Sequence, residues 1–227
     1  QALGRSYRTA PAAGTAVPGN AGAPAWWRAW RGVERPVLRE VSFALRRGRT
    51  LGVVGGSGSG KSTLALTLLQ LNEPGVGRSS GEVRLGGQRL RDIDGLSLRR
   101  RVQIVFQNPY ASLNPRMTIA QTLDEPLRIH RLHGDARGRA TRARVLLAEV
   151  GLDETALSKY PHEFSGGQRQ RIAIARCLAL EPEVLVLDEA LSALDVSVQA
   201  QVLALLRALQ ARHGLAYLFI SHDLGVV

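Results

Sequence analysis

A glycine-rich segment between an apolar run and a helical pattern constrains the fold of this chain more than any other feature. Residues 55–62 read GGSGSGKS and fit the pattern G-x-x-x-x-G-K-[ST]; they follow the apolar run Thr50–Val54 and precede the helical pattern Thr63–Leu71. Glycines allow backbone conformations that other residues rarely adopt, so successive N–H groups can converge on an anion. The helix that follows adds the positive end of its dipole. The segment therefore predicts a phosphate-binding loop between a strand and a helix.

The residues of this loop have separate expected roles at a nucleotide. Lys61 is expected to reach the β- and γ-phosphates, and Ser62 to ligate Mg²⁺. The residues expected around the phosphates are Gly55, Gly56, Ser57, Gly58, Ser59, Gly60, Lys61, Ser62 and Thr63. Alone, the loop indicates only a P-loop nucleotide-binding protein. It does not distinguish among GTPases, kinases, helicases and transporter ATPases.

Two adjacent acids follow a second apolar run. Val184–Leu187 has the length of a strand buried on both faces, and Asp188 and Glu189 come directly after it. Ligands bind at the carboxyl ends of such strands, so the acids are expected beside the phosphate loop. Asp188 is expected to hold Mg²⁺, and Glu189 to act as general base on the attacking water. The alternative is a strand that simply ends in two solvated acids.

A second glycine-containing element precedes the strongest helix candidate, Arg169–Leu180. Ser165, Gly166 and Gly167 stand where a serine cap and two glycines make another anion-binding helix end, although an ordinary capped helix has the same pattern. One nucleotide does not need two such ends on one chain. The economical arrangement is a two-fold dimer, in which this element of each chain closes over the nucleotide on the other.

Together these elements resemble the ABC transporter ATPases over almost the whole chain. The FSGGQ sequence at 164–168 is similar to the family's signature motif. Gln107 matches the Q-loop, Ser192–Asp195 the D-loop, and His222 the switch histidine. The resemblance implies that Gln107 contacts Mg²⁺ and the attacking water, that His222 contacts the γ-phosphate, and that Asp195 organises the seam of a dimer.

The same resemblance implies the remaining site residues. ATP and Mg²⁺ are the implied cofactors, with Glu189, His222, Gln107 and Lys61 as catalytic residues and Ser62, Gln107 and Asp188 as metal-binding residues. Beyond the phosphate loop, the residues implied to contact the nucleotide are Tyr7, Ser165, Gly166, Gly167, Gln168 and Asp195. Tyr7 is the candidate for stacking on adenine, and Trp30 is its alternative.

The implied fold is α/β, with a P-loop NTPase core and mainly parallel sheet, an N-terminal antiparallel β portion and an inserted helical lobe. A single domain over 1–227, C-terminally truncated, would divide into a core of 1–107 and 178–227, a helical lobe of 108–177, and a loop-like insertion at 10–36. Further expected strands are Gly4–Thr9, Val37–Leu45, Glu82–Leu85, Val102–Phe106 and Tyr217–Ile220, and further expected helices are Ile119–Ile129, Ala136–Val150 and Val196–Arg212.

Within the family, the chain is most similar to importer ATPases for dipeptides and oligopeptides. Nickel and glutathione importers share the same sequence pattern, so the transported solute stays open. The stretches that carry this similarity are Phe106–Thr118, Tyr160–Ser165 and Asp195–Val202, whereas Gly56 stands where this branch usually has Glu. The similarity implies transmembrane permease subunits, a second ATP-binding subunit of the same or a related sequence and, indirectly, an extracytoplasmic solute-binding protein. It implies a location at the cytoplasmic face of the cell membrane.

The formal charge of +11 allows a different interpretation. A soluble ABC-type ATPase acting on nucleic acid or ribosomes would favour basic charge. However, the charge is almost all arginine and spread along the chain, so a compositional bias accounts for it, and no nucleic-acid partner is expected. A module that no longer hydrolyses ATP is a third reading, which the intact catalytic residues oppose. Trp26, Trp27 and Trp30 either pack on the domain surface or contact a membrane partner or the bilayer.

Overall fold

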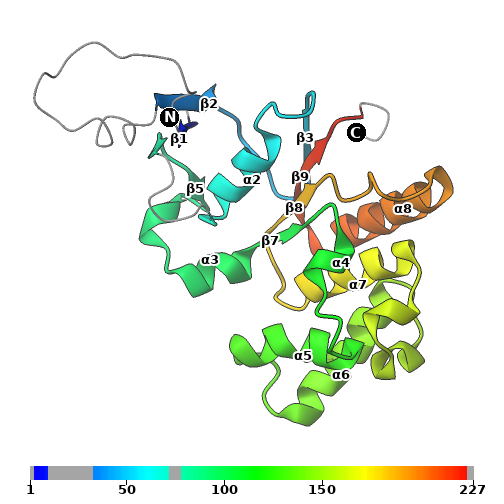
Figure 1. The fold of residues 1–227 in the computed structure, drawn as a ribbon. Helices are drawn as coiled ribbons and strands as arrows, with labels where there is room; N and C mark the ends of the chain where they lie inside the picture. Colours follow the sequence, from blue (N-terminus) through cyan, green and yellow to red (C-terminus); the bar gives the residue numbers. More distant parts are fainter. Residues whose placement is uncertain (1–2, 10–32, 72–77, 224–227) are drawn as a thin grey trace, which may run out of the picture. The chain divides into compact units, whose positions relative to one another are not determined.

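The computed structural model describes residues 3–9, 33–71 and 78–223, which fall into two compact units (Figure 1). The first unit comprises Gln1–Phe43 and Ser62–Asp92, and the second comprises Ala44–Lys61 and Ile93–Val227. The three tryptophans and most of the expected insertion at 10–36 lie outside the described residues. The end of that stretch is strand rather than loop, because β2 already begins at Val33.

The first unit contains the antiparallel β portion. β1 (Leu3–Thr9) lies between β2 (Val33–Val41) and β4 (Arg78–Ser80) and pairs antiparallel with both. β5 (Arg84–Leu85) and β6 (Gln88–Arg89) form a hairpin. Its two turn residues, Gly86 and Gly87, have φ of 57° and 83°, as a tight turn with two left-handed residues requires. The 3₁₀ turn η1 (Leu90–Asp92) follows, and helix α2 (Lys61–Leu68) lies in this unit from its second residue onward.

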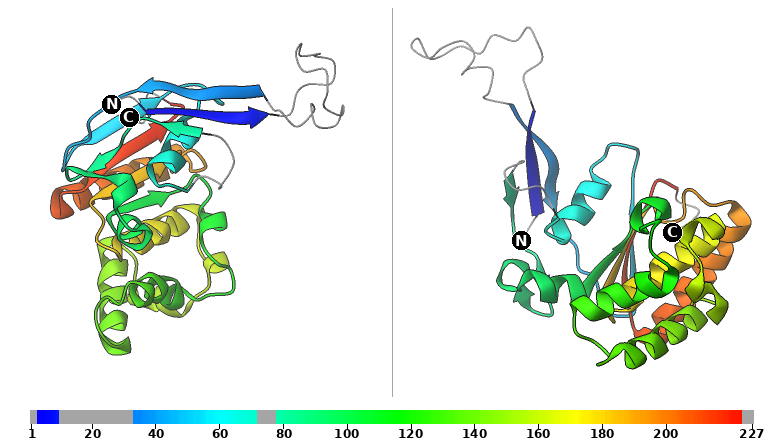
Figure 2. Two further views of the ribbon diagram at one scale, coloured as in Figure 1. Left: turned by 90° about the vertical axis from the view of Figure 1, so that its left-hand side faces the viewer. Right: turned by 60° about the horizontal axis from the view of Figure 1, so that its bottom comes forward.

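The second unit is built on a four-stranded sheet whose pairs are all parallel (Figure 2). The strand order is β3 (Thr50–Val54), β9 (Ala216–Ser221), β8 (Val184–Asp188) and β7 (Val102–Val105). Apolar residues fill β8 and β9 without alternation because both faces of these strands are buried. Leu185 and Phe219 belong to the main core, while Val186 and Ile220 are buried on the opposite face.

Helices cover one face of this sheet and continue into a helical region. α8 (Val196–His213) connects β8 to β9 and packs on the sheet, where the Tyr217 hydroxyl donates to the carbonyl of Leu206 at 2.9 Å. The other elements are α3 (Gly95–Arg101), α4 (Pro109–Ser112), α5 (Ile119–Ile129), α6 (Ala136–Glu149), the 3₁₀ turns η2 (Glu154–Ser158) and η3 (Pro161–Glu163), and α7 (Gly166–Leu178). No helix among the described residues is long and apolar enough to span a bilayer.

The expected architecture is confirmed, and several element boundaries are corrected. The strand expected at Val37–Leu45 is β2, which ends at Val41, and Glu82 precedes β5 rather than belonging to it. The helix expected at Arg169–Leu180 is α7, which begins three residues earlier because Ser165 caps it despite two glycines in its first turn. α3 was not expected from the sequence. It begins there because the Asp94 carboxylate accepts from the N–H groups of Leu96 and Ser97 at 3.1 and 2.9 Å.

Replacing Leu185 tests the contribution of β8 to the core. Its side chain has no exposed surface, so Leu185→Ala is expected to lower the free energy of unfolding by about 2–5 kcal/mol. Leu96, which is 48% exposed, is the matched control, and Leu96→Ala is expected to change stability by less than about 0.5 kcal/mol. Urea denaturation measures both. Equal effects of the two substitutions would contradict the assigned core.

Candidate active site

The carboxyl ends of all four parallel strands lead into segments that the sequence analysis singled out. β3 leads into the phosphate loop, β9 ends one residue before His222, β8 ends at Asp188, and β7 ends two residues before Gln107. Because the strands are parallel, these four ends lie along one edge of the sheet. The phosphate loop, Gln107, Asp188 and His222, which are far apart in the sequence, therefore lie along one edge of a sheet in which neighbouring strands are ~5 Å apart.

The phosphate loop encloses the ammonium group of its own lysine. Gly58 and Gly60 have φ of 77° and 92°, a backbone conformation that a residue with a side chain rarely adopts. The Lys61 Nζ donates to the carbonyls of Gly55 at 2.8 Å and Gly56 at 2.9 Å. Lys61 is only 8% exposed, so its charge is held inside the loop rather than in solvent. A positive charge and a set of glycine N–H groups are thereby concentrated at the carboxyl end of β3.

Glu189 occupies a backbone conformation that turns its side chain out of the strand pattern. Asp188 still belongs to β8, opposite Ile220 in the ladder, and is 8% exposed. Glu189 has φ of 48°, an unusual value for a residue with a side chain, while its N–H donates to the carbonyl of Ile220 at 3.0 Å. Backbone strain of this kind is often found at functional sites. The left-handed turn removes the strand alternation that would otherwise direct the two adjacent acids to opposite faces.

The Glu189 carboxylate lies between Lys61 of the phosphate loop and His222. Its Oε1 is 3.7 Å from the Lys61 Nζ, and its Oε2 is 3.4 Å from the Nδ1 of His222. The Glu189 side chain is 20% exposed and that of His222 is 54% exposed. One carboxylate thus bridges a buried cation and an accessible imidazole, an arrangement suited to positioning and deprotonating a water molecule.

A small cavity of about 70 Å³ adjoins this carboxylate. Its volume has room for a water molecule, and polar groups line it. The lining residues are Glu189, Ala190, Leu191, Ser192, Gln199, Phe219, Ile220, Ser221, His222 and Asp223. The site therefore has both a candidate base and space for the water on which it would act.

The start of α7 presents an exposed helix end. The Ser165 hydroxyl accepts from the N–H of Gln168 at 3.3 Å, and the Gln168 side chain accepts from the N–H of Ser165 at 3.0 Å. This reciprocal pair is a capping box. Ser165 and Gln168 are exposed, so the positive end of the α7 dipole faces solvent.

Asp195 has a structural role that the sequence analysis did not assign. It caps α8, accepting from the hydroxyl of Ser197 at 2.7 Å and the N–H of Val198 at 3.0 Å. These bonds, first that of Ser197, hold the pKa of the Asp195 carboxyl below its usual value. The amide of Gln199 donates to the carbonyls of Leu191 and Leu194 and so fixes the segment between β8 and α8.

Comparison with known proteins now identifies the chain's family. Residues 38–192, more than half of the chain, match the protein family described as ABC transporter. The chain belongs to the ABC transporter family. The resemblance found in the sequence is therefore confirmed.

Three relatives with curated names are similar to this cassette. YejF of Escherichia coli K12, an uncharacterized ABC transporter ATP-binding protein, is 51% identical, with 84% of this chain and 36% of YejF covered. The oligopeptide transport ATP-binding protein OppF of Bacillus subtilis 168 is 48% identical, with 83% and 62% covered. The glutathione import ATP-binding protein GsiA of Salmonella paratyphi A is 54% identical, with 84% and 30% covered. The chain thus spans 30–62% of the length of these relatives.

Solved structures agree on the fold. The dimeric structure of MJ0796, a bacterial ABC transporter cassette, matches with a TM-score of 0.71 and 30% identity, covering 86% of this chain and 83% of that one. A dimeric post-hydrolysis state of MJ0796, bound to ADP and Pi, has a TM-score of 0.70 and 26% identity, covering 98% and 89%. The ABC ATPase fold expected from the sequence is therefore confirmed.

Not every expected site residue is brought together among the described side chains of this cassette. Gln107 is exposed after β7, and Ser62 and Thr63 open the part of α2 that belongs to the first unit. Tyr7 lies in β1, opposite Arg35, and its side chain is outside the description. The roles of these four residues stay predictions.

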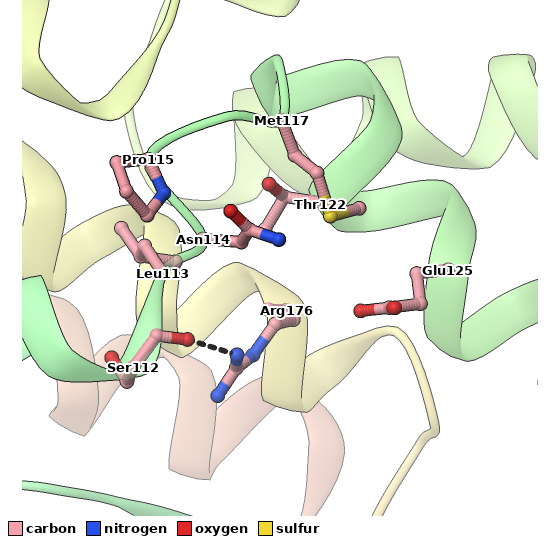
Figure 3. A pocket seen from close by; sticks show the side chains of 8 residues that line it. All are labelled: Ser112, Leu113, Asn114, Pro115, Met117, Thr122, Glu125 and Arg176. Carbon is pink, nitrogen blue, oxygen red and sulfur yellow. Dashed lines mark hydrogen bonds between the residues drawn. The ribbon is translucent and has the colours of Figure 1, made fainter.

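A larger cavity lies in the helical region, at the stretch that follows Gln107. It has a volume of about 330 Å³, and the Glu125 carboxylate points into it from α5 (Figure 3). Arg176 of α7 donates to the carbonyl of Ser112 at its wall. The lining residues are Ser112, Leu113, Asn114, Pro115, Met117, Thr122, Glu125 and Arg176. Ser112–Met117 belong to the stretch Phe106–Thr118, which carried the similarity to importers but did not predict a cavity. Thr122, Glu125 and Arg176 belong to no motif in the sequence.

Substituting Ser165 separates its capping role from any role at a nucleotide. Ser165→Ala removes the acceptor for the N–H of Gln168 and is expected to lower stability by about 1 kcal/mol. Ser165→Asn retains a capping acceptor and is the matched control, expected to keep stability within about 0.5 kcal/mol. Chemical denaturation without nucleotide measures both variants. Unchanged stability of Ser165→Ala would contradict the capping box.

Proposed function

We propose that this chain is the ATP-binding and ATP-hydrolysing part of an ABC importer, driven by closure of an ATP-bound dimer. The observation that carries the proposal is the placement of Glu189 between Lys61 and His222, beside a glycine loop at one sheet edge. Phosphoryl transfer to water needs a cation that binds phosphate, a base that acts on the water and a second hydrogen-bonding group. No other cluster of described residues offers this combination.

Binding of the triphosphate would use the glycine loop and its lysine. The N–H groups of residues 55–60 and the start of α2 supply the partial positive charge, and Lys61 supplies a full charge. Its ammonium currently donates to two loop carbonyls. We expect it to turn to the β- and γ-phosphate oxygens, since a charge-assisted bond to phosphate is stronger than one to a neutral carbonyl.

Mg²⁺ fits the chemistry of the donor groups that the sequence assigns to it. The Asp188 carboxylate at the end of β8 and the Ser62 hydroxyl are hard oxygen donors, and such sites hold Mg²⁺ through one or two protein oxygens plus phosphate and water. A three-ligand cluster, absent among the described residues, is therefore not required. When bound, the ion neutralises charge on the phosphates. Gln107 is proposed as a further contact.

Hydrolysis would depend on Glu189 and His222. The Glu189 carboxylate takes a proton from a water in the adjoining cavity while the water oxygen attacks the γ-phosphorus, and the bond to the ADP oxygen breaks. His222 is close enough to Glu189 to fix the carboxylate's orientation and accessible enough to contact a γ-phosphate oxygen. Orientation of this kind provides much of the rate gain in phosphoryl transfer.

A second copy or a related cassette would complete each site. The start of α7, where Ser165 and Gln168 are exposed and Gly166 is half-buried, would offer an anion-binding helix end, with the buried Gly167 as part of its first turn. Placed over the phosphate loop of a partner, it would bind the γ-phosphate from the other side. ATP favours the closed dimer because only that state forms both sets of contacts, and hydrolysis then releases it. The dimeric cassette of MJ0796 supports this arrangement by similarity.

The 330 Å³ cavity is the proposed contact with a transmembrane permease subunit. Its wall is the segment that follows Gln107, so a partner seated there would sense the site through β7. Identities of 48–54% to peptide and glutathione transport proteins support import of dipeptides, oligopeptides or a related solute. A solute-binding protein would then act indirectly, and the cassette would work at the cytoplasmic face of the membrane.

Glu189→Gln tests the chemical step. The substitution keeps the side chain's size but removes the base, so ATP binding is expected to persist while turnover falls at least about 100-fold. MgATP should then trap a dimer. Steady-state phosphate release, nucleotide binding and sedimentation measure the three outcomes, with Glu154→Gln as an exposed-glutamate control. Turnover at the wild-type rate would remove Glu189 from its role.

Glu125→Lys tests the contact with the permease. Glu125 lies in the cavity and outside the catalytic cluster, so ATPase activity of the isolated protein is expected to stay unchanged. Stimulation by the co-purified permease should be lost through charge reversal in the contact. Glu154→Lys, the same reversal at a side chain 64% exposed, is the control. Full stimulation of the Glu125 variant would place the permease elsewhere.

A further inference from the structure

The two glycines that open α7 have different surroundings. A Cβ built on Gly167 would stand 2.4 Å from the Cγ1 of Val198, a separation that real atoms do not tolerate. Gly167 is buried, so its missing side chain is filled by a residue of α8. The absence of a side chain at this position therefore permits the first turns of α7 and α8 to touch.

Gly166 has room that Gly167 lacks. A Cβ on Gly166 would be 3.5 Å from the Cδ2 of Leu194, an ordinary van der Waals contact, and the residue is half-buried. The packing around position 166 in this chain therefore leaves space for a methyl group. The requirement for glycine at position 167 arises within the chain, from α8.

Val198 is held in place from both of its sides. Its N–H donates to the Asp195 carboxylate at 3.0 Å, and its side chain packs against the main core. A β-branched side chain in a helix is almost restricted to one rotamer, so Val198 cannot turn away from Gly167 at little cost. Farther along, Arg171 of α7 donates to the Gln201 side chain of α8 at 3.0 Å. These contacts join the first turns of α7 and α8 to each other.

We propose that Val198 is a positioning residue for the signature motif, through direct packing on Gly167. The contact joins the D-loop aspartate, which caps α8, to the helix end that would bind a partner's nucleotide. A displacement of Asp195 at the dimer seam passes through Val198 to Ser165 and Gly166 of the same chain. This inference rests on the proposed function, because the orientation of α7 matters only if its exposed end binds phosphate.

A rescue experiment tests the packing in the full-length protein carrying Glu189→Gln. The readout is the MgATP concentration that gives half-maximal dimerisation, measured by sedimentation. Gly167→Ala is expected to raise it about tenfold or more because the added methyl overpacks the α7–α8 contact. Val198→Ala is expected to raise it about threefold through lost contact. The double variant should return to the level of Val198→Ala, since the smaller side chain makes room for the methyl.

Gly166→Ala is the matched control, because the added methyl group has space within the chain. Any rise in the MgATP concentration for half-maximal dimerisation would then come from contact with the nucleotide. Val198→Ala should not rescue it. A Gly167→Ala defect that persists in the double variant, or no defect at all, overturns the inference. If the Glu189→Gln protein without further substitutions stays monomeric at saturating MgATP, the result contradicts the proposed function and leaves the packing of Val198 on Gly167 to be tested separately. The inference is then decided by amide hydrogen exchange at residues 166–168, which Gly167→Ala should accelerate and the double variant restore.

Discussion

Parallel pairing of four strands is the constraint on which the rest of this structure depends. Side-by-side strands of one direction put the phosphate loop, the acid pair, the switch histidine and Gln107 at the same sheet edge. Parallel strands need long crossover connections, and these connections supply the helical region and α8. The fold therefore gathers distant motifs and also creates the helix starts that carry the signature motif and the D-loop. A single topological rule relates the core, the cluster of Lys61, Glu189 and His222, and the start of α7.

The positive charge of Lys61 at this edge is compensated by groups close to it. The ammonium of Lys61 is shielded by its own loop and faces the Glu189 carboxylate at 3.7 Å. A buried cation without a partner is costly, so the loop carbonyls and the carboxylate stabilise it where a triphosphate is proposed to bind. The left-handed backbone at Glu189 has a cost as well. This conformation directs the Glu189 carboxylate toward Lys61 and His222 rather than toward the opposite face of β8.

Most of this arrangement could be predicted from the sequence because its signals are local. Thr50–Val54 was predicted with the bounds that β3 has, and the mainly parallel sheet was implied by the resemblance that the local motifs carry. The capping of α3 by Asp94 was missed because a polar, glycine-bearing stretch has no apolar periodicity. The conformation of Glu189 and the contact between Gly167 and Val198 could not be predicted. The first depends on the ladder of β8 with β9, and the second on the packing of helices 30 residues apart.

Cross-linking between two differently substituted copies tests the shared nucleotide site most directly. Gly56 has open space around it and Ser165 is exposed, whereas the single native cysteine, Cys177, is buried. Gly56→Cys in one full-length copy and Ser165→Cys in the other, mixed in the Glu189→Gln background with a short bifunctional thiol reagent, should yield covalent dimers. The account predicts that MgATP raises their yield severalfold and that neither variant alone forms them. A yield that is independent of MgATP, or equal in the unmixed variants, would contradict it.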